Sequence, residues 1–202
     1  MSSVATGPAG VRASAAKIVA AVIDEGRSLD DLLAADNDEG SARGLKRSLC
    51  YGTLRWHVRL AAILNALATR SPDQLAPRLR ALLEIGLFQL VAGDTAAHAA
   101  VSETVSAARV LGFEKAAGFV NAILRRFQRE QADILHAIDR DVALRTAHPR
   151  WFVDALRADR GEAALAALDA NNAHPPLWLR VNTMRGDIAR ARTELEAAGF
   201  TV

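Results

Sequence analysis

Cysteine is almost absent from this sequence. Its 202 residues include a single one, Cys50, so no internal disulfide can form and no second thiol is available for a zinc or redox site. This usage favours a reducing compartment such as the cytoplasm. A lone cysteine can act as a nucleophile, but no histidine or asparagine pattern near Cys50 supports its activation. We therefore interpret Cys50 as a structural residue, packed as a small apolar side chain.

Long apolar runs and targeting signals are also absent. No run approaches the roughly 18 apolar residues that a membrane-spanning helix needs. Residues 1–11 have neither a basic start nor an apolar core, so they predict a disordered leader rather than a secretion signal. The sequence thus predicts a soluble protein without membrane contact.

Signatures of catalysis are missing as well. No glycine-rich phosphate loop follows a strand pattern, no Gly-Lys-Ser/Thr triplet occurs, and no pair of carboxylates stands out. His98 has only Asp94 at a helical interval, so we interpret it as a helix-entry residue rather than a metal ligand. His148 precedes a proline, where capping or packing accounts for it. The sequence predicts no catalytic residue, metal or cofactor in this chain.

What the sequence does contain is a helical pattern. Half of its residues are hydrophobic, which is enough to bury a core in one domain or slightly more. From Arg12 to His136, alanine and leucine recur at helical spacing, and blocks of aromatic and β-branched residues with period two are missing. Five or six helices fit this stretch, with breaks at Gly26, Gly40, Ser71-Pro72, Gly93-Asp94 and Gly112. We predict an all-α helical bundle.

Residues 42–70 have the clearest helix pattern, provided that Gly52 bends the helix without breaking it. At about 100° per residue, six apolar residues fall within an arc of roughly 60° and predict a core-facing stripe: Leu45, Leu49, Trp56, Leu60, Ile63 and Leu67. Arg43, Arg47 and Arg55 point well away from this stripe, and Lys46 and Arg59 flank it at roughly 70° from its centre. The basic residues are therefore expected to wrap the exposed side of the helix.

The pattern changes after His148-Pro149. Short helices are predicted around 151–160 and 162–171, followed by a break at Pro175-Pro176. Residues 177–182 are the best strand candidate, and a helix over 187–198 and the start of another strand follow. Since such a set cannot close a sheet alone, the chain is expected to end inside a small α/β domain. The three tryptophans, Trp56, Trp151 and Trp178, are all interpreted as packing residues.

These observations divide the chain into three regions. They are a disordered leader (1–11), a helical domain (12–140), and linker helices with the start of a small α/β, RRM-like domain (141–202).

Basic residues are unevenly distributed. Lysine and arginine outnumber acids only by 25 to 23, yet residues 41–83 hold eight basic residues against one acid, Asp73. One interpretation is a solvated helix face, because arginine is a good helix former. The other is phosphate binding. A second cluster, Arg125, Arg126 and Arg129, favours nucleic acid, since arginine binds phosphate through two hydrogen bonds and stacks on unpaired bases.

Several motifs in this order resemble a known family. The motifs are LCYGTLR (49–55), AHAAVSETV (97–105), GFVNAILRRF (118–127), AHPRW (147–151), Asn171-Asn172, Pro175-Pro176 and LRVNT (179–183). The first three resemble a NusB-type helical domain. Together the set resembles the amino-terminal part of the ribosomal RNA small-subunit methyltransferase B family (Sun/Fmu), which are RNA cytosine-5 methyltransferases. The match covers nearly everything from Arg12 onward.

The resemblance implies S-adenosylmethionine-dependent methylation of carbon 5 of a cytosine in 16S rRNA. In the family, a Rossmann-like domain carries out this reaction with two cysteines and binds the cofactor. That domain follows the matched region and is expected to be absent from this chain, and Cys50 matches neither catalytic cysteine. S-adenosylmethionine is thus expected in the missing catalytic domain, which is the expected partner domain of this chain.

The resemblance also implies binding of small-subunit rRNA. Relatives use a basic amino-terminal stretch and nearby helices, whereas the corresponding stretch here carries only Arg12 and Lys17. This departure moves the prediction toward the long helix and the second cluster. The predicted RNA-binding residues are Arg12, Lys17, Arg43, Lys46, Arg47, Arg55, Arg59, Arg125, Arg126 and Arg129.

Two rival functions remain open. A NusB-like transcription antitermination factor would bind RNA and a ribosomal protein, although the region after His148 counts against it. A protein-docking module would use its basic face for an acidic partner, and it would lack salt-sensitive RNA affinity. The leading prediction is the RNA-targeting region of a 16S rRNA cytosine-C5 methyltransferase.

Overall fold

The structure is a computed structural model that describes residues 7–35, 40–69, 71–92, 95–173 and 178–201. The chain forms two compact units, residues 1–172 and 173–202. Two predicted breaks, Gly93-Asp94 and Pro175-Pro176, lie outside the described residues, as do residues 1–6 of the predicted leader.

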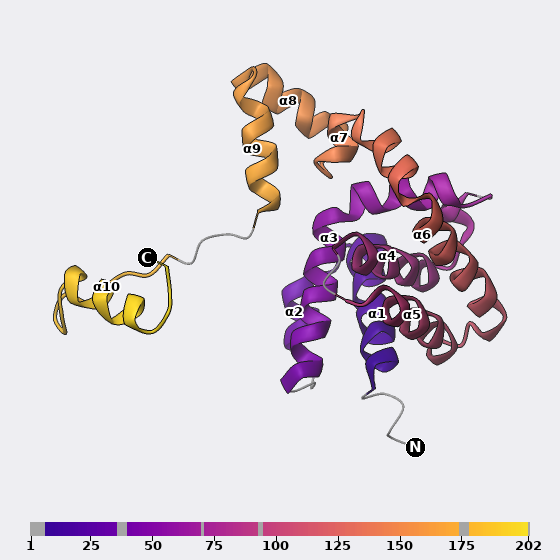
Figure 1. The fold of residues 1–202 in the computed structure, drawn as a ribbon, viewed down its shortest axis with the longest axis horizontal. Helices are drawn as coiled ribbons and strands as arrows, with labels where there is room; N and C mark the ends of the chain where they lie inside the picture. The colour runs from indigo at the N-terminus through magenta and orange to yellow at the C-terminus, as the bar shows by residue number, and fades with distance from the viewer. Residues whose placement is uncertain (1–6, 36–39, 70, 93–94, 174–177, 202) are drawn as a thin grey trace. The chain divides into compact units, whose positions relative to one another are not determined.

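The first unit begins with a helical bundle (Figure 1). Its described helices are α1 (Pro8–Glu25), α2 (Leu29–Ala34), α3 (Gly40–Leu67), α4 (Pro77–Ala92), α5 (Ala97–Val110) and α6 (Ala117–Asp139), with short 3₁₀ turns at Pro72–Gln74 and Glu114–Ala116. The prediction of a bundle of five or six helices is confirmed over the described part of this stretch. Gly52 does not break α3, which is continuous.

Helix α1 begins earlier than the sequence pattern indicated. Pro8 occupies the first turn, where a proline loses no helical hydrogen bond, and Val11 is buried. The last part of the predicted disordered leader is therefore helical. The alternation of alanine with a few larger residues hid this start, because it gives only a weak apolar stripe.

The core lies where α1 and α4 meet. Helix α4 packs against α1, α3, α5 and α6, and Leu82, Leu83 and Leu87 are fully buried. Helix α1 presents small residues, among them Ala15 and Ala16, which let its backbone approach α3, α4 and α5 closely. Burial of each of these leucine side chains stabilises the folded state by about 1.5–3 kcal/mol relative to leaving the side chain exposed.

Three shorter helices complete the first unit. Helix α7 (Val142–Arg145) packs against α3 and α6, and α8 (Arg150–Arg160) packs against α9 (Ala163–Asn172). Ala147 follows α7 with a left-handed φ of 55°, a conformation that L-residues other than glycine rarely adopt. The ring of His148 stacks on Phe152 with 5.4 Å between centroids, so its predicted packing role is confirmed. Trp151 is 71% exposed, so the prediction that it is a packing residue is wrong for this structure.

The second unit contains α10 (Ile188–Ala197), which begins after Asp187. The side chain of Asp187 accepts a hydrogen bond from the Arg190 backbone N–H at 2.8 Å and caps the helix. The predicted strand is not formed: residues 178–182 have no regular structure, and no other strand occurs in the described residues to pair with them. Trp178 is accordingly 88% exposed instead of packed.

Among the described residues, no helix combines the length and the apolar composition that crossing a membrane requires.

Candidate nucleic-acid interface

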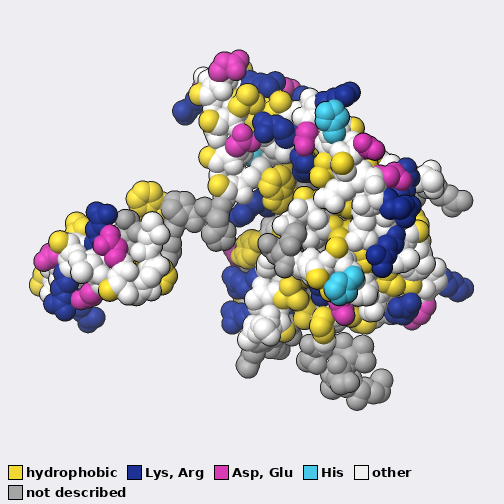
Figure 2. All heavy atoms as spheres, viewed as in Figure 1, with side chains coloured by type: hydrophobic (Ala, Val, Ile, Leu, Met, Phe, Trp, Pro, Cys, Tyr) yellow, Lys and Arg dark blue, Asp and Glu magenta, His cyan; other side chains and the backbone are white. Residues whose placement is uncertain are grey.

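The exposed side of α3 carries a row of basic residues around one aromatic ring. Arg43, Arg47, Tyr51 and Arg55 are spaced four residues apart, so they follow one another along the helix surface. We call these four residues the α3 ridge. All four are exposed, and among the described residues none of the three arginines has a carboxylate within 4.0 Å. In Figure 2, basic side chains gather along the edge where the first half of α3 lies.

Tyr51 holds the middle of the ridge in place. Its hydroxyl donates a hydrogen bond of 2.6 Å to Oδ1 of Asp30 on α2, and the guanidinium of Arg47 lies 5.7 Å from the centre of its ring. The hydrogen bond to Asp30 raises the pKa of Tyr51, so the phenol stays protonated. The sequence prediction omitted Tyr51, although its position four residues after Arg47 was a usable signal.

Three predicted RNA-binding residues are not on the surface. Arg12 is 3% exposed, Lys46 2% and Arg59 9%. The prediction that the basic residues of the long helix wrap its exposed side is therefore wrong for Lys46 and Arg59. The helical wheel gave the direction of each side chain correctly. It could not show that α3 packs against α1, α4, α6 and α7, which cover both flanks of its apolar stripe.

The buried arginines connect helices. Nε and Nη2 of Arg12 donate to Oε1 of Gln89 at 3.0 and 2.6 Å, and burial lowers the pKa of Arg12. Nη1 of Arg59 donates to Oδ1 of Asp139 at 2.5 Å and to the Arg145 carbonyl at 3.1 Å. These side chains are therefore structural in this conformation.

Lys17 does lie on the surface, beside cations that the sequence did not group with it. Lys17, Arg27 and Arg78 line one cavity of about 470 Å³, together with Phe113 and Leu32. Glu25 lines it as well, with its Oε2 4.0 Å from Nη1 of Arg27, so the cavity holds three cations and one acid. We call it the Lys17 cavity. Because Leu32 and Asp30 belong to the same short helix, α2 contributes to both the Lys17 cavity and the α3 ridge.

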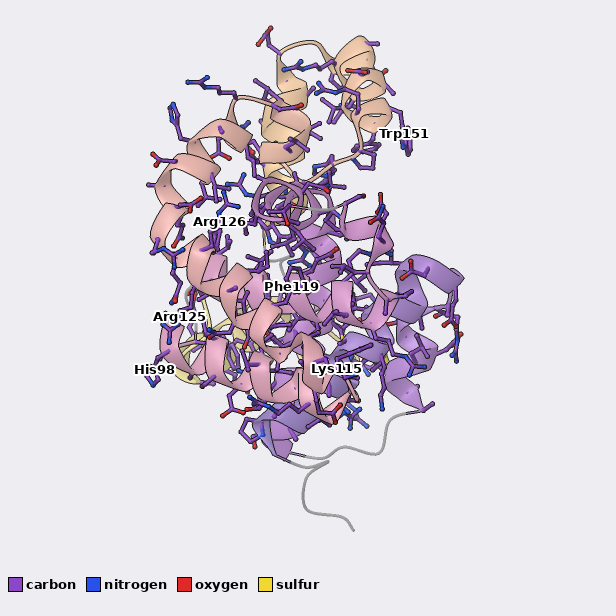
Figure 3. The ribbon with its side chains drawn as sticks, turned by 90° about the vertical axis from the view of Figure 1, so that its right-hand side faces the viewer. His98, Lys115, Phe119, Arg125, Arg126 and Trp151 are labelled. Atoms are coloured by element: carbon purple, nitrogen blue, oxygen red, sulfur yellow. The ribbon has the colours of Figure 1, made fainter. Side chains whose placement is uncertain are left out.

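The second arginine cluster is divided between two roles. Arg125 and Arg129 are exposed on α6. Arg126 is half-buried, where it pairs with Glu130 at 3.0 Å and donates to the Leu67 carbonyl at the end of α3 at 2.8 Å. Figure 3 shows Arg125 at the edge of α6 on the same side as His98, with Arg126 further along the helix. In Figure 1 the first half of α3 and helix α6 lie on opposite sides of the bundle, so the structure does not unite the two predicted groups.

A half-buried histidine on α3 pairs with a buried glutamate on α4. Nδ1 of His57 is 2.7 Å from Oε2 of Glu84, whose side chain is 1% exposed. The hydrogen bond to Glu84 raises the pKa of His57 against the opposing effect of burial. Asp24, Asp73 and Arg80 are the charged neighbours of this pair. Neither residue belongs to a motif that predicted a functional role.

The remaining candidates for chemistry have structural surroundings. Cys50 is fully buried, with its Sγ 4.0 Å from the Ala15 carbonyl, which confirms the packing interpretation. His98 is exposed near the start of α5, and the described residues contain no group of three or more metal-ligating side chains. They also contain no strand.

Comparison with known proteins found two family models that match this chain. The NusB family matches residues 10–129, and the ferredoxin-like domain of Methyltr_RsmF/B-like proteins matches residues 148–202. In the second range the described residues form helices and no strand.

Similar curated proteins carry the name ribosomal RNA small subunit methyltransferase B. The protein from Pseudomonas putida is 43% identical over 173 residues, which is 85% of this chain and 40% of that protein. The one from Xylella fastidiosa (strain 9a5c) is 39% identical over 189 residues, 92% of this chain and 43% of that protein. The one from Pasteurella multocida is 35% identical over 191 residues, 94% of this chain and 42% of that protein. The chain thus spans about two fifths of the length of these relatives.

Proposed function

The chain belongs to the NusB family, and from this premise we propose that its helical bundle binds small-subunit rRNA through exposed cations on both sides of α2. The observation that supports this proposal is the joint position of the α3 ridge and the Lys17 cavity. Phosphate contacts of this kind give affinity and orientation without reading sequence. Arg125 and Arg129 on α6 would form a second, separate contact.

The α3 ridge is suited to RNA by its mixture of side chains. Its arginines are close to solvent, so they can reach phosphate groups without losing a buried hydrogen bond. Arg47 is held against the ring of Tyr51, which is itself fixed by Asp30, so fewer rotamers are lost when an RNA binds.

The RNA-binding bundle would serve a methylation reaction. We propose that it is the targeting region of an S-adenosylmethionine-dependent 16S rRNA cytosine-C5 methyltransferase. The catalytic domain and the cofactor would belong to the part of the relatives that this chain does not span. Its site of action would be the cytoplasm, where rRNA is modified. The match of residues 148–202 to a methyltransferase-associated domain favours this context over a free-standing antitermination factor.

The test is RNA binding across a salt series, with an oligonucleotide from 16S rRNA. Three variants separate the basic groups: Arg43→Ala/Arg47→Ala/Arg55→Ala, Lys17→Ala/Arg27→Ala/Arg78→Ala, and Arg125→Ala/Arg129→Ala. We expect the first two to weaken binding and to lower the salt dependence, because each lost phosphate contact reduces the slope by about 0.7–0.9.

The matched control removes three exposed arginines from a helix outside the NusB match, with Arg150→Ala/Arg157→Ala/Arg160→Ala. It changes net charge as much as either triple variant, so it should retain affinity if position matters. Equal losses in all triple variants would mean that only overall charge attracts RNA. Salt-insensitive or undetectable binding by the unmodified chain would refute the proposal.

A further inference from the structure

We propose that a cavity beside Trp56 accepts one unpaired nucleobase of the RNA that the α3 ridge binds, and this inference rests on the proposed function. The cavity has a volume of about 450 Å³, which lies within the usual range of small-ligand pockets. Helices α3 and α4 contribute two aromatic rings, Trp56 and Phe88, and Asp139 and Arg145 come from the far end of α6 and from α7. We call it the Trp56 cavity.

The aromatic wall depends on a missing side chain. Gly52 lies one helical turn before Trp56, and a Cβ placed on it would be 2.1 Å from Cζ of Phe88. The ring of Phe88 therefore occupies the space that any other residue at 52 would fill, and it lies directly against the backbone of α3. Trp56 and Phe88 are both only half-buried, so aromatic surface remains open to the cavity. Bases stack on such surfaces whatever their identity.

One edge of the Trp56 cavity is polar and fixed. Arg59 is held by Oδ1 of Asp139 and by the Arg145 carbonyl, while the Asp139 side chain remains 42% exposed. A carboxylate and a guanidinium side by side can accept from ring or exocyclic N–H groups and donate to ring carbonyls. A nucleobase is a planar ring with hydrogen-bond donors and acceptors on its edge. It can therefore stack on the aromatic wall and form hydrogen bonds with this polar edge. An aliphatic protein side chain would make no hydrogen bond with the exposed part of the Asp139 carboxylate.

The charge around the Trp56 cavity also suits a nucleotide. The α3 ridge ends at Arg55, which immediately precedes Trp56 in the chain and is exposed. Arg145, with a 36% exposed side chain, lies on the α7 side of the cavity, and its Nη1 is 3.3 Å from Oδ1 of Asp169. Because consecutive helical residues point about 100° apart, a strand whose phosphates follow the α3 ridge would have to turn partly around α3 for one of its bases to enter the cavity.

Tryptophan fluorescence gives a direct test on the full chain. Trp151→Phe and Trp178→Phe replace two exposed tryptophans and leave Trp56 as the single reporter. The probes are a short uridine oligonucleotide and a strand of the same length whose sugars carry hydrogen in place of a base. We expect the uridine strand to quench Trp56 emission and to bind about tenfold more tightly than the strand without bases. The strand without bases should bind through its phosphates and leave the emission unchanged.

A variant that fills the Trp56 cavity separates a base site from phosphate binding. Ala92 lines the cavity and is exposed at the end of α4, so Ala92→Leu blocks it without opening the core. Ala66→Leu, at an exposed position of α3 that does not line it, is the matched control. We expect Ala92→Leu to abolish the quenching and to weaken uridine binding about tenfold, with Ala66→Leu unchanged.

Two results would overturn the inference and leave RNA binding intact: equal quenching by both strands, or full quenching and affinity in Ala92→Leu. Failure of every protein to bind either strand would instead refute the proposed function, and the inference with it.

Discussion

The contact between Gly52 and Phe88 can be tested by stability measurements. Gly52→Ala should lower the free energy of unfolding when Phe88 is present and raise it when the ring is removed. Gly52→Ala changes two free energies in opposite directions. Alanine in the middle of a helix is favoured over glycine by about 1 kcal/mol, which stabilises α3. The new methyl group would lie 2.1 Å from Cζ of Phe88, so the ring must move, and forcing extra volume into a packed site costs about 1–3 kcal/mol. We expect a net loss of roughly 0–2 kcal/mol in the free energy of unfolding.

The same substitution should stabilise a chain that lacks the ring. Phe88→Ala alone should cost about 3 kcal/mol through lost packing. In that background nothing opposes the helix preference, so Gly52→Ala should now raise the free energy of unfolding by about 1 kcal/mol. The double-mutant cycle therefore carries a coupling of roughly 1–3 kcal/mol.

Urea denaturation followed by far-UV circular dichroism measures all four proteins of this cycle. Gly112→Ala is not a suitable control, because its φ of 83° strains alanine, whereas Gly44 is helical and a Cβ there would have open space. Gly44→Ala should stabilise the chain in both backgrounds. If Gly52→Ala raises the free energy of unfolding of the unmodified chain as much as Gly44→Ala does, the ring of Phe88 does not lie against α3 and does not form this wall of the Trp56 cavity.

Three further predictions address other parts of the first unit. The pKa of His57 is raised above its usual value of about 6.5, so its pair with Glu84 stabilises the fold fully below that pH. This contribution should disappear as the pH rises through the raised pKa. His57→Gln should therefore flatten the pH dependence of the urea midpoint. Ala147→Gly should raise the unfolding free energy by about 1 kcal/mol, because glycine accepts a φ of 55° without strain; a decrease in thermal stability would contradict this. Arg59→Met should lower the free energy of unfolding by about 1.5–3 kcal/mol, because it removes a buried guanidinium and its hydrogen bonds. Arg55→Met should change it by less than about 0.5 kcal/mol, because Arg55 is exposed. Equal effects in denaturation would contradict the division into structural and exposed arginines.

The apolar pattern predicted the interior of the bundle well. Leu49, Leu60 and Ile63 of the α3 stripe are buried as expected, because residues that recur at the helical period share one face whatever surrounds the helix. The apolar pattern of a helix does not indicate how many other helices pack against it. For α3, packing against several helices buried Lys46 and Arg59 beside the stripe.

Other features depend on contacts between residues far apart in the sequence. Arg12 is buried because Gln89, 77 positions later, accepts its hydrogen bonds, and no local pattern predicts such a partner. The Lys17 cavity likewise joins residues of α1, α4 and the segments after α1 and α5. The strand predicted at 177–182 has a suitable composition, yet a strand forms only beside another strand, and the described residues hold none.

Helix α2 explains how a nearly neutral chain can present a coherent basic surface. A helix of six residues is too short to be stable alone, so its position must be fixed by contacts. Ser28 caps it by accepting from the Asp31 N–H, Leu33 is buried against the core, and Asp30 accepts from Tyr51. Through this hydrogen bond Asp30 fixes the middle of the α3 ridge. Ion pairs elsewhere cancel acids and bases one for one and leave the net charge of +2 unchanged, so the basic surface that an RNA meets arises from the grouping of exposed arginines on the α3 ridge.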